Sequence, residues 1–277
     1  MNDGVKIPKV GFGTFQIPAD GSAYRTVREA LAAGYRHIDT AAAYFNEEEV
    51  GRAIKDSGIL REEIFLTTKL WLQDYGYEQG KKGIERSLRH LGTYIDLMLI
   101  HQPYGDVVGA WKAMEEYKQA EDIRSLGVSN MTPSLWRKLA PELASIPSVN
   151  QVEFNPYYQQ KEIRELMAKD KVDLEAWAPL GRGSKELFAE PVLTRLAEKY
   201  HKDAGQIILR FEVQEGCIAL PHSTKPKRMR TNLEIFDFEL TEDEMDSIRR
   251  LDKGHGTHNP DAPGVEEKLR KAFVIKD

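Results

Sequence analysis

Four ionisable side chains lie at or just beyond the carboxyl ends of predicted strands. Asp39, Lys69 and His101 each close a short, largely apolar run, and Tyr44 follows Asp39 in the next loop. If these runs are parallel strands of one barrel, their carboxyl ends share a single rim, which is where barrel enzymes build their active sites. The sequence therefore predicts that the four side chains meet at one site.

These residue types suit the reduction of a carbonyl group. Addition of hydride to the carbonyl carbon leaves a developing alkoxide, which needs a proton donor. Tyrosine, with an unperturbed pKa of about 10, is a poor donor near neutral pH unless a cation stabilises its phenolate. We expect Lys69 to be that cation, Asp39 to hold its ammonium group, and His101 to orient the carbonyl oxygen or relay a proton to Tyr44. Taken singly, each residue also has an ordinary structural explanation, as a loop cap, an ion-pair partner or a packing residue, and the shared rim is what favours catalysis.

Short apolar runs alternate with longer amphipathic stretches along the chain. Eight runs have the length and composition of strands, at residues 9–14, 36–40, 64–70, 95–101, 125–130, 149–154, 174–180 and 217–222. Helical patterns fall between them, at residues 24–33, 48–57, 77–91, 107–119, 134–144, 162–168 and 204–215. This alternation predicts a single-domain (β/α)8 TIM barrel over residues 1–277. Two extra helices are expected, at 191–200 and 243–251, followed by an irregular surface tail.

The composition excludes several classes of protein. The 277 residues carry a net charge of −5 with both signs dispersed, so neither a nucleic acid nor an anionic membrane is an expected partner. No segment has the length of a membrane span, and the N-terminus lacks the apolar region of a signal peptide. Cys217 is the only cysteine, so it has no partner for an internal disulfide, and its apolar neighbours predict a buried strand residue. We expect a soluble, monomeric, cytoplasmic protein.

Several motifs then match one family in order and spacing, from about Gly11 to Phe238. They are Ile-Asp-Thr-Ala-Ala-Ala-Tyr at 38–44 followed by Asn46-Glu47, Thr-Lys-Leu-Trp at 68–71, Leu-Ile-His at 99–101, Gly-Val-Ser-Asn at 127–130, Asn-Gln-Val-Glu at 150–153 and Asn-Pro at 155–156. With this set the chain resembles the aldo-keto reductases, and Glu-Ala-Trp-Ala-Pro-Leu at 175–180 is similar to the shorter bacterial members related to 2,5-diketo-gluconate reductase. The resemblance implies that Tyr44 is the general acid, that Lys69 and Asp39 tune it, and that His101 positions the substrate.

The expected cofactor is NADP(H), with NAD(H) as a second possibility. The segment 11–16 lacks the third glycine of a Rossmann fingerprint, whereas barrels bind phosphate in the loops after strands seven and eight. Here these are residues 180–184 and 221–228; the second loop is basic, carries hydroxyl groups and opens a helix, which suits phosphate. Its alternative interpretation is a solvated run of charge.

The resemblance also implies which residues bind the cofactor. Ser129, Asn130 and Gln151 would hold the nicotinamide carboxamide, and Trp177, which alone would be read as a core aromatic, would stack on the ring. The full expected set is Gly13, Thr14, Asp39, Ser129, Asn130, Gln151, Trp177, Leu180, Ser184, His222, Ser223, Thr224, Arg228, Thr231 and Asn232. His222 stands where relatives usually have the lysine that pairs with the 2′-phosphate, and Thr231 where they usually have glutamate, so a moderate preference for NADP is expected.

The substrate is expected to be a small carbonyl compound in a pocket lined by Phe15, Tyr44, Trp71, His101 and Tyr104. Two other functions remain open on the sequence. One is a nicotinamide-binding redox sensor or scaffold subunit with little turnover. The other is a metal-dependent barrel hydrolase, which would need His-x-His or clustered carboxylates at strand ends; the sequence has neither there, and we expect no metal. The tail histidines His255 and His258 are interpreted as solvated loop residues.

Overall fold

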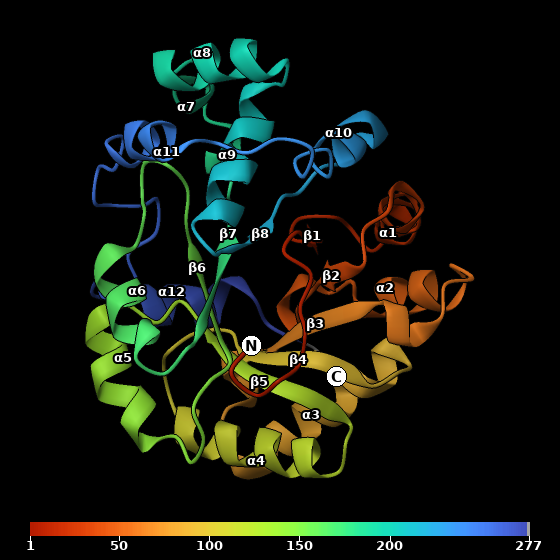
Figure 1. Ribbon diagram of the computed structural model, residues 1–277. Helices are drawn as coiled ribbons and strands as arrows, with labels where there is room; N and C mark the ends of the chain where they lie inside the picture. The colour runs from red at the N-terminus through yellow and green to blue at the C-terminus, as the bar shows by residue number, and fades with distance from the viewer. Residues whose placement is uncertain (276–277) are drawn as a thin grey trace.

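Eight parallel strands in sequence order form the inner wall of a barrel in the computed structural model, which describes residues 1–275 (Figure 1). Residues 9–11 and Ala219 close the barrel, because Gly11 N–H donates to Ala219 O and Ala219 N–H donates to Lys9 O, both at 2.9 Å. The predicted fold is thus confirmed. The strands are β1 Phe12–Gly13, β2 His37–Asp39, β3 Phe65–Leu70, β4 Ile95–Ile100, β5 Ile123–Ser129, β6 Val149–Glu153, β7 Asp173–Trp177 and β8 Ile218–Leu220.

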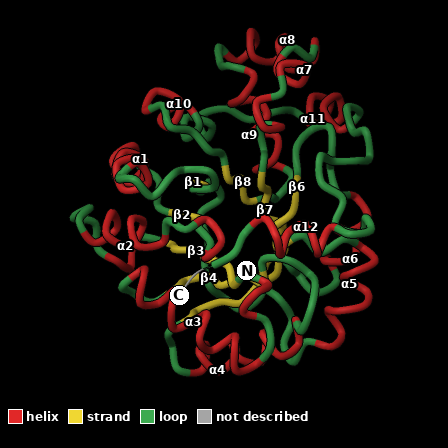
Figure 2. Tube along the Cα trace, turned by 180° about the vertical axis from the view of Figure 1, so that it is seen from behind, coloured by secondary structure: helices red, strands yellow, loops and turns green. Residues whose placement is uncertain are grey.

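Helices surround this wall, and their ends carry the capping signals that the sequence contains (Figures 1 and 2). Gly34 and Gly92 adopt left-handed φ values of 112° and 66° as C-caps, and the Thr132 hydroxyl caps the helix that begins at Pro133. The helices are α1 Ser22–Ala33, α2 Glu47–Lys55, α3 Tyr77–Leu91, α4 Val107–Gln119, α5 Pro133–Leu139, α6 Lys161–Ala168, α7 Lys185–Phe188, α8 Pro191–Tyr200, α9 Ala204–Gln214, α10 Pro226–Thr231, α11 Glu242–Arg249 and α12 Val265–Ala272. Short 3-10 turns are η1 Ala42–Tyr44, η2 Arg61–Glu63, η3 Leu72–Asp74, η4 Ala140–Glu142 and η5 Gly181–Gly183.

The two extra helices of the prediction are α8 and α11, but the expectation of a wholly irregular tail was wrong. Helix α12 forms because its charges suit a helix: Glu266 and Glu267 lie in the first turn, and Arg270 and Lys271 lie in the last. The i,i+4 ion pairs Glu266–Arg270 (2.9 Å) and Glu267–Lys271 (2.6 Å) add a little to this preference.

The two ends of the barrel are covered differently. Residues near the N-terminus pass across the end that faces the viewer in Figure 1, whereas the tail with α12 lies at the opposite end, seen in Figure 2. A small buried apolar cluster closes the first end, formed by Phe65, Leu97, Leu99 and Val149 with Met1, Val5 and Ile7 packed against it. Phe65 and Val149 of this cluster are the first residues of β3 and β6, so the carboxyl ends of the strands lie at the opposite end. No helix within residues 1–275 is long and apolar enough to cross a membrane.

One buried acid lies outside every cluster of polar groups. Glu212 on α9 is fully buried, and neither of its carboxyl oxygens has a hydrogen-bond partner among the described residues. Burial raises the pKa of Glu212 well above its ordinary value, so the folded protein keeps this side chain protonated and neutral. Cys217, which follows α9, is buried as predicted.

Glu212 should therefore cost the protein stability at neutral pH. Since its pKa is higher in the folded than in the unfolded state, the pH-dependent part of its penalty is absent below the unfolded pKa of about 4 and grows with pH until the folded pKa is reached. We expect Glu212→Met, which has a similar length and no charge, to raise the free energy of unfolding by about 1–3 kcal/mol at pH 7. The gain should shrink toward pH 4.

Chemical denaturation of the wild type and the variant between pH 4 and pH 8 measures this effect. Glu215→Met is the matched control, because Glu215 at the end of the same helix forms ion pairs with Arg164 and Arg249, each at 2.7 Å, and its loss should destabilise the fold. A Glu212→Met gain that is absent, or independent of pH, would contradict the argument.

Candidate active site

The four residues predicted to act together do meet at one end of the barrel. Asp39 is the last residue of β2, Lys69 lies in β3, His101 directly follows β4, and Tyr44 ends the turn η1 after β2. Parallel strands present these carboxyl ends on a common rim, so residues up to 62 positions apart in sequence become neighbours.

Lys69 is the centre of this cluster. Its ammonium nitrogen lies 2.6 Å from Asp39 Oδ1, 3.0 Å from the backbone oxygen of Thr40 and 3.3 Å from Tyr44 Oη. The side chain is 0% exposed. All three hydrogens of the ammonium group therefore have acceptors, which is what allows a charge to remain in the interior.

The charges within the cluster oppose the effect of burial. Burial disfavours the charged form of Lys69, but Asp39 and Tyr44 raise its pKa above the ordinary value, so it stays protonated. Burial raises the pKa of Tyr44, and the positive charge of Lys69 acts in the opposite direction without reversing the shift. The sequence analysis predicted that Lys69 lowers the pKa of Tyr44. The charge of Lys69 does act in that direction, but the loss of water on burial has the larger effect, so the pKa of Tyr44 is raised. Tyr44 remains protonated at neutral pH.

His101 packs against both Tyr44 and Trp71. Its ring centroid is 5.6 Å from that of Tyr44 and 5.0 Å from that of Trp71, with edge-to-face geometry in both pairs. Burial and the nearby charge of Lys69 hold the pKa of His101 well below its usual range. The imidazole is therefore neutral, with one nitrogen able to donate a hydrogen bond.

Asn46, which no sequence argument placed in a role, fixes the loop that carries Tyr44. Its Oδ1 accepts a hydrogen bond from Thr40 Oγ1 at 2.8 Å, and its Nδ2 donates to the backbone oxygens of Thr14 and Ile17. Asn46 is part of the sequence motif at 38–47, but only the fold shows that its side chain ties the Tyr44 loop to the segment after β1.

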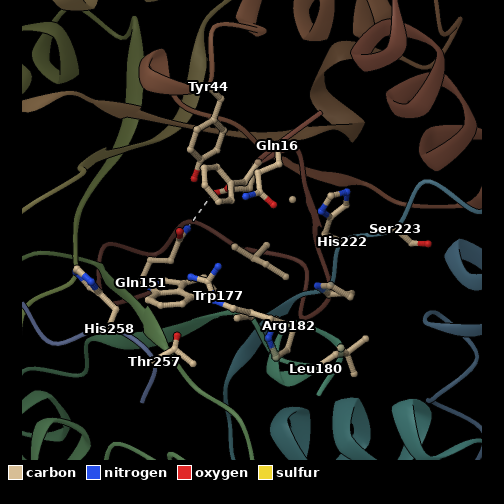
Figure 3. Close-up of a pocket in the computed structure, with 18 of the residues that line it drawn as sticks. Gln16, Tyr44, Gln151, Trp177, Leu180, Arg182, His222, Ser223, Thr257 and His258 are labelled. Atoms are coloured by element: carbon tan, nitrogen blue, oxygen red, sulfur yellow. Dashed lines mark hydrogen bonds between the residues drawn. The ribbon is translucent and has the colours of Figure 1, made fainter. Parts of the chain in front are cut away.

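A cavity of about 1000 Å³ extends along the rim from Asp39, Tyr44 and His101, while Lys69 lies buried behind its wall (Figure 3). Figure 3 shows Tyr44 at one wall, Trp177 and Arg182 opposite it, His222 and Ser223 to one side, and Thr257 and His258 to the other. Most residues predicted for the site line this cavity, namely Gly13, Phe15, Asp39, Tyr44, Trp71, His101, Ser129, Asn130, Gln151, Trp177, Leu180, His222, Ser223, Arg228, Thr231 and Asn232.

Other predicted site residues lie elsewhere. Thr14 is buried and donates its hydroxyl to Asp39 O at 3.0 Å, Ser184 caps the start of α7, and Thr224 is exposed in the loop after β8. Tyr104 was predicted to line the substrate pocket, but its hydroxyl donates to a backbone oxygen of the tail at 2.7 Å and it lies outside the cavity wall. Its role there is to hold the tail in place.

Residues at the ends of β5, β6 and β7 form a connected polar group. Asn130 adopts a left-handed φ of 60°; its Nδ2 donates to His101 O and its Oδ1 accepts from Trp177 Nε1, both at 3.0 Å. Ser129 Oγ donates to the backbone oxygen of Gln151 at 2.8 Å. The structure therefore brings together the residues that the resemblance assigned to one ligand group.

The far end of the cavity is basic and exposed. Arg228 on α10 and Ser223 line it, and His222 packs edge-on against Phe12 at 6.4 Å between ring centroids. His222 is accessible to solvent, yet the protein around its ring removes part of its hydration and lowers its pKa, so it is neutral at pH 7. This end is suited to a multiply charged anion.

Sequence reasoning missed the contribution of the tail and of Arg182. Leu269, Phe273, Thr257 and His258 line the cavity, so the interpretation of His258 as a solvated loop residue was wrong. Arg182 in the loop after β7 has a left-handed φ of 55° and places its guanidinium 5.2 Å from the centre of the Trp177 ring. The sequence did contain a signal for Arg182, since it is a basic residue within the predicted phosphate loop. It contained no signal that the tail lines the cavity, because the position of the tail depends on the tertiary fold.

Hydrogen bonds to backbone atoms hold the tail against the cavity. The Glu153 carboxylate accepts the N–H groups of Thr257 at 2.8 Å and His258 at 3.2 Å. Trp71 Nε1 donates to the backbone oxygen of Phe273 at 2.9 Å. Among residues 1–275, no group of three or more His, Cys, Asp or Glu side chains is arranged to hold a metal ion.

Comparison with known proteins agrees with this geometry. Residues 9–253 match the model of the Aldo/keto reductase family. An aldo-keto reductase of Mycolicibacterium smegmatis is 45% identical over 92% of this chain and 93% of its own length. Glyoxal reductase of Bacillus subtilis is 42% identical over 94% of this chain and 95% of its own. The crystal structure of a Bombyx mori aldo-keto reductase in complex with NADP superimposes with a TM-score of 0.85 at 34% identity, covering 99% of this chain and 96% of that one. The chain therefore belongs to the aldo/keto reductase family, and carbonyl reduction, rather than a sensing or scaffold role, is its function.

Proposed function

We propose that the protein reduces aldehydes and ketones to alcohols with NADP(H), and that Tyr44 is the general acid. The observation that carries this assignment is the 3.3 Å contact between Tyr44 Oη and the buried ammonium of Lys69, at the floor of a cavity with a separate basic end. Through this contact, the ammonium group of Lys69 can stabilise the phenolate that forms on Tyr44 during proton transfer.

The cavity has groups suited to both ends of the cofactor. Asn130 and Gln151 offer amide groups near Tyr44 for the nicotinamide carboxamide, and Trp177 offers a ring for stacking. Ser223 and Arg228 at the basic end suit a 2′-phosphate. NADPH supplies the hydride when bound, and the NADP complex of the Bombyx mori relative supports this choice.

The residues around the substrate carbonyl group have separate roles. His101, being neutral, donates a hydrogen bond that orients the carbonyl oxygen toward Tyr44. As negative charge develops on that oxygen, Tyr44 donates its proton to it, and Lys69 stabilises the remaining phenolate while Asp39 holds the ammonium in place. Because burial raises the pKa of Tyr44, the donor stays protonated well above neutral pH, which suits reduction.

The cavity wall beyond Tyr44 is aromatic and apolar. Phe15 lies 5.0 Å from Tyr44 and Phe273 lies 5.5 Å from Trp71 between ring centroids, and Leu269 adds an aliphatic surface. We propose small aldehydes and ketones with apolar substituents as substrates. A panel of such carbonyls, followed by the loss of nicotinamide absorbance with NADPH and with NADH, tests the assignment.

Replacement of Tyr44 by Phe should abolish most turnover without loss of cofactor binding. Only the proton donor is removed, and general acid catalysis is worth roughly 10²–10⁴-fold in rate. We expect kcat to fall by about that factor and the Kd for NADPH, measured by fluorescence titration, to stay within about twofold. Tyr24→Phe, at a half-buried tyrosine on α1 whose hydroxyl donates to Asp56 and which does not line the cavity, is the control for loss of a hydroxyl. A Tyr44→Phe enzyme that keeps most of its kcat would remove Tyr44 from the role of acid.

Arg228→Ala should reduce the preference for NADPH over NADH, because it should lower kcat/KM for NADPH alone. A charge-assisted hydrogen bond is worth about 1.5–3 kcal/mol, which is roughly a 10- to 150-fold change in kcat/KM for NADPH. NADH lacks the phosphate and should change little. Because His222 is neutral at pH 7, the wild-type preference should be moderate and should strengthen as the pH falls and His222 takes up a proton.

Arg230→Ala is the matched control, since Arg230 is exposed on the same short helix but does not line the cavity. Equal losses from Arg228→Ala and Arg230→Ala, or equal losses with NADPH and NADH, would show that α10 contributes only a general positive field.

A further inference from the structure

Glu175 is a buried carboxyl group next to the proposed catalytic residues, and the mechanism above does not use it. It lies in β7, directly across from Gln151 of β6 in the strand register, and is 0% exposed. Its carboxyl group approaches both Gln151 and His37, and His37 belongs to β2, which does not pair with β7. The Glu175 side chain must therefore point into the barrel interior.

The Gln151 amide connects Glu175 to the proposed catalytic group. Gln151 Nε2 donates one hydrogen to Glu175 Oε2 at 2.7 Å and the other to Asp39 Oδ2 at 2.8 Å. Both hydrogens of the nitrogen are thereby used on the inner side. Gln151 also lines the cavity, where Figure 3 shows its side chain between Tyr44 and Trp177. The amide oxygen is thus the atom left to accept a hydrogen bond from a ligand.

The same contacts fix Asp39. One of its oxygens accepts from Lys69 at 2.6 Å and the other from Gln151 at 2.8 Å. A continuous chain of contacts therefore runs from Glu175 through Gln151, Asp39 and Lys69 to Tyr44. The second Glu175 oxygen is 3.5 Å from His37 Nε2 and has no hydrogen-bond partner among the described residues.

We propose that Glu175 is a positioning residue of the reductase: through Gln151 it directs an amide oxygen toward the cofactor carboxamide and holds Asp39 against Lys69. This inference rests on the proposed function, because it concerns the same site. Without Glu175, the amide would lose an acceptor for one of its two hydrogens and would be free to turn that hydrogen toward the cavity. The acceptor presented to the cofactor would then be replaced by a donor in part of the molecules.

The charges around Glu175 add a dependence on pH. Asp39 on β2 and Asp173 on its own strand repel its negative charge and Lys69 on β3 attracts it, while His37 on β2, whose pKa burial lowers to about 3, is neutral. Burial and Asp39 together raise the pKa of Glu175 to about 8. Glu175 is then largely protonated at pH 7, and its ionisation above pH 8 raises the pKa of Tyr44 further. That change favours the protonated acid needed for reduction over the phenolate needed for alcohol oxidation.

Two variants separate the hydrogen bond from the charge. Glu175→Leu removes the acceptor, and we expect the Kd for NADPH to rise about tenfold, the worth of one buried hydrogen bond. Glu175→Gln keeps an oxygen for Gln151 Nε2, so its Kd should stay within about twofold. In that variant, however, alcohol oxidation should rise at a lower pH than in the wild type, because no charge at position 175 opposes formation of the phenolate.

The measurements are NADPH titration, the pH dependence of kcat in both directions from pH 6 to 10, and thermal unfolding of each variant. Glu212→Gln is the matched control, since it makes the same change at a buried glutamate outside the site. Absence of carbonyl reduction by the wild type would refute the proposed function, whereas the NADPH titration tests Glu175 independently of turnover.

An unchanged Kd in Glu175→Leu, or one that changes equally in Glu175→Gln, would overturn the positioning role. An oxidation profile that is the same in Glu175→Gln and the wild type would overturn the charge effect. Should Glu175→Leu fail to fold, Glu175→Gln decides both points: a Kd for NADPH raised well beyond twofold, although an acceptor for Gln151 Nε2 is kept, would overturn the positioning role, and an unmoved oxidation profile would overturn the charge effect.

Discussion

The site depends on one buried positive charge. An ammonium group inside a barrel is stable only if its hydrogens are all accepted and its charge is balanced, and Lys69 meets both conditions through Asp39, the Thr40 carbonyl and Tyr44. These acceptors come from β2 and the turn that follows it, so β2 and β3 must keep their register. The register places His37 beside Phe65 and Asp39 beside Thr67. A shift by one residue would turn Asp39 away from the interior and leave the ammonium uncompensated.

Alternation of strands and helices made most of the fold predictable from the sequence. All eight strands appear where apolar runs were found, and the helices α3, α4 and α8 have the predicted bounds, because each is amphipathic and bounded by clear turn or capping residues. The predicted strand ends alone also place Asp39, Lys69 and His101 on one rim. The sequence could not show that Asn46 ties the Tyr44 loop to the segment after β1, since that contact joins a side chain to two distant carbonyl groups.

Two physical effects limited the prediction of the site. The first is desolvation, which a motif does not display: Tyr44 sits beside a cation, as expected, yet its pKa is raised because the loss of water outweighs the charge. The second is long-range packing of weakly patterned sequence. The tail after Leu251 lacks apolar periodicity at its start. Its position over the cavity follows from contacts with Glu153 and Trp71, which lie 104 or more positions away from their partners along the chain.

The manner in which the tail is attached has an evolutionary consequence. Glu153 accepts backbone N–H groups, Trp71 donates to a backbone oxygen, and Gln73 pairs with both the N–H and the oxygen of Ile275 at 3.0 and 2.9 Å. Bonds of this kind do not depend on which side chains the tail carries. The outer wall of the pocket can therefore accumulate substitutions, and with them new substrate preferences, while its attachment and the barrel stay intact. Gly256 is an exception, because a Cβ atom there would lie 2.5 Å from Glu153 Oε2, so substitution at this position would disturb the attachment itself.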